Sequence, residues 1–236
     1  MTFLIAGTVK GVTGMGLPTV AMGVLGTLML PAQAASLLIL PSFITNVWQL
    51  LAGPGVIALI RRFWLMMAGI VVGTVIAASF IAGGGGTWAV TGLGAALTLY
   101  AVSGLLAWRF SVSPQYERRF SPLVGILTGL ITGGTGVFVV PAVPYLQALD
   151  LKKEDLVQAL GLSFTVSTVA LAIGLARENA FAFGDINHSL LAVVPALLGM
   201  WIGQSVRERI SPAGFRRWFF ICLLALGLQL LLRRFF

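Results

Sequence analysis

The residues best suited to chemistry lie near the start of the chain, where Lys10 precedes a glycine-rich stretch at residues 11–16. Lys10 supplies a positive charge, and glycines let a ligand approach the backbone closely. A glycine destabilises a helix by about 1 kcal/mol and a proline by about 3, so the apolar run around this stretch and Pro18 is expected to break. A broken helix exposes N–H groups that attract anions. The stretch therefore indicates one half of an anion-binding site.

A second stretch of the same kind runs from Thr132 to Pro141. Its Gly134-Thr135-Gly136 is expected to match Gly14-Met15-Gly16 of the first stretch, and threonines in both stretches supply hydroxyl donors beside the exposed backbone. Small residues also let helices pack closely without any ligand, and the sequence leaves that alternative open.

Two amide side chains, Asn46 and Gln49, lie three residues apart and therefore share one face of a helix. Ser163 lies in the corresponding region of the second half. A buried amide needs hydrogen-bond partners, which either a substrate or a neighbouring helix can supply. The predicted substrate-binding residues are Lys10, Thr13, Gly14, Met15, Gly16, Asn46, Gln49, Thr132, Gly133, Gly134, Thr135, Gly136 and Ser163.

Carboxylates are absent from the interiors of the apolar runs, because the Asp and Glu residues all lie in connectors or at the ends of runs. Proton pumps and cation carriers generally need a carboxylate at depth, so an anion is the expected cargo. The sequence contains no Cys or His cluster, no nucleophile elbow and no phosphate-binding lysine loop. We therefore expect a protein that is not an enzyme and has no metal and no cofactor.

The composition identifies the elements that must hold these residues. Hydrophobic residues make up 58% of the 236 residues and charged residues only 9%, against about 25% charge in soluble domains. The expected class is a polytopic membrane protein with about six to eight crossings of about 20 residues each. Basic residues lie in pairs between the apolar runs, which favours membrane orientation over nucleic-acid binding.

The two glycine-rich stretches open two similar halves of the chain. The predicted organisation is an N-terminal repeat at 1–110, a polar connector at 111–121 and a C-terminal repeat at 122–236. Each repeat is expected to be all α, with one Gly-rich broken or re-entrant helix hairpin followed by three transmembrane helices.

The charges in the loops distinguish two topologies. If each broken run crosses the membrane, the Lys and Arg residues divide almost evenly between the two sides. If each run re-enters and returns, the division is strongly uneven, which the positive-inside rule favours. The repeats are then inverted, both termini lie outside the cytoplasm, and the two glycine tips meet near the midplane. The expected cytoplasmic residues are Arg61, Arg62, Arg109, Arg118, Arg119, Lys152, Lys153, Arg207, Arg209, Arg216 and Arg217, and the opposite side holds Arg177, Arg233 and Arg234.

Three stretches carry a resemblance to a known family: Gly7 to Pro18, Asn46-Val47-Trp48-Gln49, and Thr132 to Pro141. Together they resemble the TauE/SafE family, also called TSUP, of sulfite and organosulfonate exporters. The similarity runs from near Gly7 to the C-terminal end. It implies transport of small sulfur oxyanions or organic anions across the bacterial inner membrane.

The leading hypothesis is a secondary transporter of a small anion that binds between the two tips and is released by alternating access of the two repeats. An anion channel built from the same glycines and threonines is one alternative, and a membrane-embedded enzyme is a weaker one. Proton coupling would need a titrating substrate or a titrating lysine. The expected partners are a small anionic substrate, the lipid bilayer and, in the coupled case, a proton, but no nucleic acid.

Overall fold

The computed structural model describes residues 1–236 except 84–85, 107–110, 181–182, 208, 210 and 234–236. The described residues form α-helices and no strand, which confirms the predicted all-α class. The helices of the first half are α1 (Thr2–Thr13), α2 (Leu17–Leu25), α3 (Pro31–Leu51), α4 (Val56–Ala82) and α5 (Gly86–Leu106). Those of the second half are α6 (Pro114–Thr135), α7 (Ala142–Gln147), α8 (Lys153–Arg177), α9 (Phe183–Arg207) and α10 (Pro212–Leu232).

Six of these helices are long and apolar enough to cross a membrane: α3, α4, α5, α8, α9 and α10. The chain is therefore a multi-pass membrane protein, as its composition predicts. Helix α1 has 12 residues and so extends about 18 Å, which is less than the roughly 30 Å of a hydrocarbon core. Helix α6 is longer, but its first turns carry Glu117, Arg118 and Arg119.

The two glycine-rich runs break where the sequence predicts. Helix α1 ends at Gly14, which has a φ of 76°, and α2 begins after Gly16, which has a φ of 99°. Helix α6 ends at Gly136 with a φ of 71°. An L side chain avoids these left-handed angles, so glycine is needed at each helix end. We call residues 13–16 the first elbow and residues 135–141 the second elbow.

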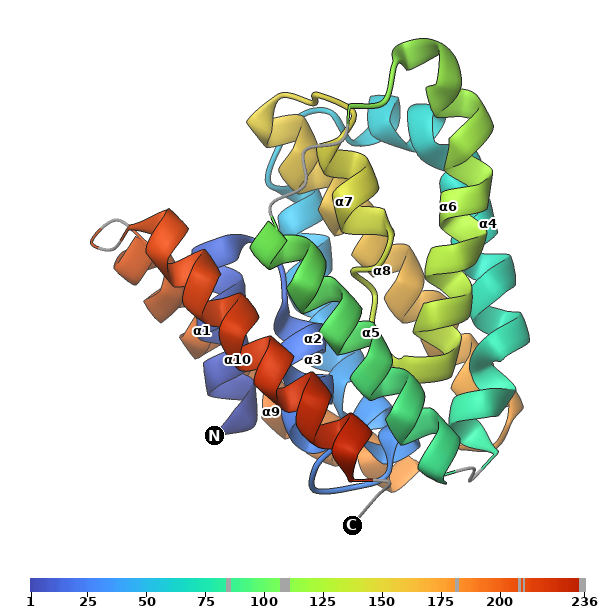
Figure 1. The fold of residues 1–236 in the computed structure, drawn as a ribbon, viewed down its shortest axis with the longest axis vertical. Coiled ribbons are helices and arrows are strands. Elements are labelled where there is room, and N and C mark those ends of the chain that lie inside the picture. The colour runs from blue at the N-terminus through green and yellow to red at the C-terminus, as the bar shows by residue number, and fades with distance from the viewer. Residues whose placement is uncertain (84–85, 107–110, 181–182, 208, 210, 234–236) are drawn as a thin grey trace.

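The broken helices enter from opposite ends of the molecule (Figure 1). Helix α1 starts at the end where both termini lie, and the chain then turns back through α2 to a loop at that same end. Helix α6 starts at the other end, and α7 lies back towards it. Each half thus contains a broken helix pair that returns towards its own starting end, followed by three long helices.

Both entry helices pack against a helix of the opposite half along lines of glycine, which we call the glycine seams. In the α4–α6 seam, a methyl group at Gly69 would lie 2.7 Å from the Pro122 carbonyl oxygen. In the α1–α9 seam, a methyl group at Gly11 would lie 2.8 Å from the Gly203 Cα. The backbones are therefore in near contact, and a larger side chain would separate the helices.

The directions of packed helices follow from which residues meet. In the α4–α6 seam, Gly69 of α4 meets Pro122 of α6, and further along Ala77 of α4 meets Gly133 of α6. The residue numbers rise together, so the two helices run parallel. Helices α3 and α8 instead run antiparallel: the Asn46 amide meets Thr168, and the Leu50 carbonyl meets Gln158.

Positive charge gathers at the end of the molecule opposite the termini. The α3–α4 and α7–α8 connections lie at this end (Figure 1), which we call the basic end. Arg61, Arg62, Lys152 and Lys153 adjoin these two connections, whereas Arg177 ends α8 and Arg233 follows α10. Arg109 and Arg234 of the predicted groups lie outside the described residues.

Candidate functional site

Lys10 is buried in the interior of the helix bundle, with 3% of its surface exposed. Its ammonium group donates hydrogen bonds to the Thr45 hydroxyl, at 3.2 Å, and to the Asn46 side-chain oxygen. Both partners are neutral. Among the described residues, Lys10 is the one charged side chain that is buried. A buried cation without a counter-charge is costly, so its presence here points to a role for the charge.

Asn46 connects three helices at this point. Its oxygen accepts from Lys10 on α1, and its amide nitrogen donates to the Thr168 hydroxyl on α8 at 3.4 Å. Asn46 itself lies on α3, so one side chain joins both halves of the chain. The structure therefore brings together Lys10 and Asn46, which the sequence predicts separately, and adds Thr168, which the sequence analysis misses.

Several hydroxyls on the same two helices are buried without a hydrogen-bond partner. They are those of Ser42 on α3 and of Ser163 and Ser167 on α8. Gln49 donates to the Val157 carbonyl at 2.9 Å, while its side-chain oxygen is also unpartnered. Buried polar atoms are usually satisfied, so these atoms leave hydrogen-bonding capacity on α3 and α8 unused.

The first elbow is held by its own threonine. The Thr13 hydroxyl lies 2.9 Å from the Val9 carbonyl and 2.6 Å from the Met15 carbonyl, and accepts from the Met15 N–H at 3.2 Å. A methyl group placed on Gly14 would meet nothing within 4 Å. The elbow is thus a capped helix end with free space beside it.

The second elbow repeats this construction. The Thr135 hydroxyl donates to the Ile131 carbonyl at 2.6 Å and accepts from the Val137 N–H at 3.2 Å. These bonds make Thr135 the structural equivalent of Thr13, and Gly136 that of Gly14. The predicted alignment of Gly134-Thr135-Gly136 with Gly14-Met15-Gly16 is therefore wrong by two residues, because the helix-ending threonine and glycine set the register rather than the Gly-x-Gly spacing.

The surroundings of the second elbow are much tighter. A methyl group on Gly136 would lie 2.9 Å from Met22 Cε, and one on Gly133 would meet the Ala77 side chain at 3.0 Å. The Thr132 hydroxyl, at the position equivalent to Lys10, donates to the Thr128 carbonyl at 2.7 Å. Gly134 has open space beside it.

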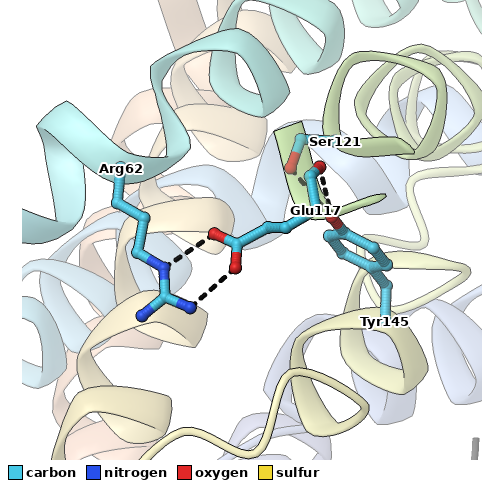
Figure 2. Close-up of polar contacts among 4 residues, drawn as sticks. All are labelled: Arg62, Glu117, Ser121 and Tyr145. Atoms are coloured by element: carbon cyan, nitrogen blue, oxygen red, sulfur yellow. Dashed lines mark hydrogen bonds and ion pairs between the residues drawn. The ribbon is translucent and has the colours of Figure 1, made fainter. Parts of the chain in front are cut away.

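A polar cluster ties the two arms of the second elbow together (Figure 2). The Tyr145 hydroxyl on α7 donates to the Glu117 carbonyl at 2.9 Å and lies 2.8 Å from the Ser121 hydroxyl, both on α6. The Glu117 carboxylate accepts two hydrogen bonds from Arg62 on α4, each 2.7 Å long. Helix α7 is thereby fixed to α6, and α6 to α4.

A cavity of about 790 Å³ lies near the basic end. The tip of α1, the return arm α7 and the adjoining ends of α5, α9 and α10 form its walls. Arg207 and Arg216 contribute positive charge, and Asp150 contributes a carboxylate. Its lining residues are Val12, Thr13, Met15, Tyr100, Ser103, Gly104, Ser111, Val143, Pro144, Gln147, Ala148, Asp150, Arg207, Arg216, Phe219 and Phe220.

The structure does not gather the predicted site residues in one place. Lys10 and Asn46 meet between α1 and α3, and Thr13 and Met15 line the cavity. Residues 132–136 do not line it, so the cavity joins the tip of one elbow to the return arm of the other rather than two tips. Tyr100, Arg207 and Arg216 are cavity residues that the sequence analysis does not predict as site residues, since it counts the two arginines only as loop cations.

A family model described as "Sulfite exporter TauE/SafE" matches residues 1–230. No curated protein matches the chain, and no solved structure does.

Proposed function

Because the chain belongs to the TauE/SafE family of sulfite exporters, we propose that it is a secondary transporter of a small anion, either a sulfur oxyanion or an organosulfonate. The anion crosses the bacterial inner membrane by alternating access, with the basic end of the molecule in the cytoplasm. Membership of the family supports the transport of an anion, and the geometry around Lys10 supports the choice of the residues that would bind it.

The observation that carries this proposal is the buried Lys10 ammonium, whose partners are the neutral side chains of Thr45 and Asn46. An anion that reaches Lys10 supplies the missing counter-charge and relieves the cost of burying the cation. The unpartnered hydroxyls of Ser42 and Ser167 on the adjoining helices offer further donors to its oxygens.

The arrangement of the helices supports alternating access. The corresponding helices α3 and α8 run antiparallel, and so do α5 and α10, where Gly94 meets Gly227 and Gly104 meets Phe220. Antiparallel packing of equivalent helices is the arrangement that inverted repeats produce, and such transporters bind substrate at the repeat interface. Asn46 and Thr168 lie at the α3–α8 interface.

The test is sulfite flux in proteoliposomes that contain the full chain. Wild-type protein is expected to move sulfite faster than protein-free vesicles, at a rate that saturates with concentration. Lys10→Met preserves the length of the side chain but removes its charge, so the flux should fall by about 100-fold, in keeping with the 1.5–3 kcal/mol of a charged hydrogen bond.

The matched control is Lys152→Met, which removes an exposed lysine beyond the cavity lining and should transport like the wild type. Lack of sulfite, thiosulfate or sulfonate flux in the wild type would contradict the proposal, as would wild-type flux in a folded Lys10→Met variant. Single-channel currents would indicate the channel alternative instead.

A further inference from the structure

We propose that the cavity at the basic end is itself an anion-binding site, in which the Tyr100 hydroxyl and the guanidinium groups of Arg207 and Arg216 hold the anion before it reaches Lys10. This inference rests on the proposed transport of an anion and adds the residues that capture it. The experiment below measures binding apart from transport.

Tyr100 presents a hydroxyl that is poorly satisfied. The residue is 2% exposed, and its ring packs edge-on against Phe220 with centroids 5.2 Å apart. Its hydroxyl donates to the Met15 sulfur at 3.3 Å. A thioether is a weak acceptor, whereas a buried hydroxyl normally finds an oxygen or nitrogen. An anion oxygen in the cavity would therefore replace the Met15 sulfur at little cost.

Arg207 and Arg216 supply the charge that favours an anion here. Arg207 ends α9, Arg216 lies near the start of α10, and both are exposed. Within the described residues, neither forms a salt bridge. Among the described lining residues, Asp150 is the one carboxylate and stands against two guanidinium groups, so their sum is positive. Guanidinium groups bind oxyanions through paired N–H donors, which an ammonium group cannot do.

The position of the cavity connects it to Lys10. Val12 and Thr13 line the cavity, and Lys10 lies one turn earlier on the same helix α1. Lys10 is buried and is not among the lining residues. The structure therefore has a separate capture site and interior site, joined by the last turn of α1.

Binding is measured by thermal unfolding of the purified full-length protein in detergent with increasing sulfite, and with methanesulfonate as a second probe. A ligand that binds only the folded state raises the melting temperature according to its concentration relative to Kd. Tyr100→Phe removes only the hydroxyl and keeps the contact with Phe220. Tyr100→Phe and Arg216→Gln should each weaken apparent sulfite binding by roughly 10-fold.

The matched controls are Tyr116→Phe and Arg217→Gln, because both residues are exposed and neither lines the cavity. Their apparent Kd should equal the wild-type value. The effect of Arg216→Gln should also shrink as NaCl is raised, since salt screens exposed charges.

Wild-type sulfite affinity in both Tyr100→Phe and Arg216→Gln would overturn the capture site and leave the transport proposal standing. A wild-type protein that shows no sulfite-dependent shift would overturn it as well. If Tyr100→Phe does not fold, Arg216→Gln alone tests the capture site, because Arg216 is exposed and its replacement leaves no buried gap. Failure of transport with intact binding would instead contradict the proposed function.

Discussion

The two elbows share one backbone construction but have different surroundings. Each helix ends at a left-handed glycine, and the preceding threonine caps it with the same pair of hydrogen bonds. One turn before the cap, however, the first elbow has Lys10 and the second has Thr132. The first elbow adjoins a cavity, whereas the second packs against Met22. The second is also held by the Tyr145 hydroxyl, whose contacts with Glu117 and Ser121 on α6 we call the Tyr145 clamp.

This difference separates the structural use of the motif from its chemical use. A capped, glycine-ended helix is present in both halves, so the cap alone does not explain a binding site. Among the described residues, the buried charge of Lys10 and the cavity that Thr13 and Met15 line both belong to the first elbow's side. We therefore predict that the second elbow is a fixed support and that the first elbow presents the groups that would meet an anion.

The largest effect is expected when the charge is moved to the other elbow. Thr132 is fully buried, and its hydroxyl is bonded within its own helix. Thr132→Lys places an ammonium there without the amide oxygen that Asn46 gives to Lys10, so it should lower the free energy of unfolding by at least about 3 kcal/mol. Thermal unfolding in detergent measures the loss.

The reciprocal variant, Lys10→Thr, removes a buried charge but leaves the Asn46 oxygen without this donor, so it should destabilise the protein less than Thr132→Lys while losing sulfite flux. If Thr132→Lys were as stable as the wild type, both elbows would tolerate a buried cation equally. The proposed difference between the two elbows would then be wrong.

A smaller effect is expected from a methyl group at each helix-ending glycine. A left-handed L residue costs about 1–2 kcal/mol, which both Gly14→Ala and Gly136→Ala incur. Gly136→Ala also forces Met22 Cε away from 2.9 Å, whereas the space beside Gly14 is empty. Gly136→Ala should therefore melt several degrees below Gly14→Ala, and equal melting temperatures would mean that the second elbow is not tightly packed.

The Tyr145 clamp should contribute about 1 kcal/mol. Tyr145→Phe removes the bonds to the Glu117 carbonyl and Ser121 and leaves the buried Ser121 hydroxyl without that partner. Its melting temperature should fall, and hydrogen exchange in α7 should accelerate. Tyr116→Phe serves as the control. Unchanged exchange in α7 would show that the clamp does not hold the second elbow.

The smallest effect is expected at the ion pair of Arg62 and Glu117. The Arg62 side chain is 43% exposed, and such pairs contribute about 0.2–1 kcal/mol. Arg62→Gln should lower stability within that range at low salt. The difference from the wild type should vanish near 1 M NaCl, where the screening length is about 3 Å. A difference that persists at high salt would indicate packing rather than charge.

The sequence predicts the breaks and the membrane class because both depend on local composition. Glycine and proline cost helix stability wherever they stand, and long apolar runs need lipid or protein around them. The elbows therefore lie where the glycines cluster. The same local reasoning identifies Lys10, because a lysine inside an apolar run is costly in any fold.

The contacts of the site depend on tertiary packing and cannot be predicted from local composition. Lys10 and Asn46 are far apart in the sequence, and only the packing of α1 on α3 joins them. The sequence marks Arg216 only as a loop cation and does not mark Tyr100, yet both line the cavity. Gln49, predicted to face substrate, bonds to the Val157 backbone of α8, and Ser163 is buried on α8 with an unpartnered hydroxyl. Their role in binding stays a prediction.

The glycine seams have a consequence for the independence of the two halves. Helix α1 rests on α9, and α6 rests on α4, so each half supplies the surface on which the other half's first helix lies. A polypeptide cut within residues 111–121 would yield two fragments whose glycine-lined faces are uncovered. We therefore expect that neither fragment forms a complete interior alone.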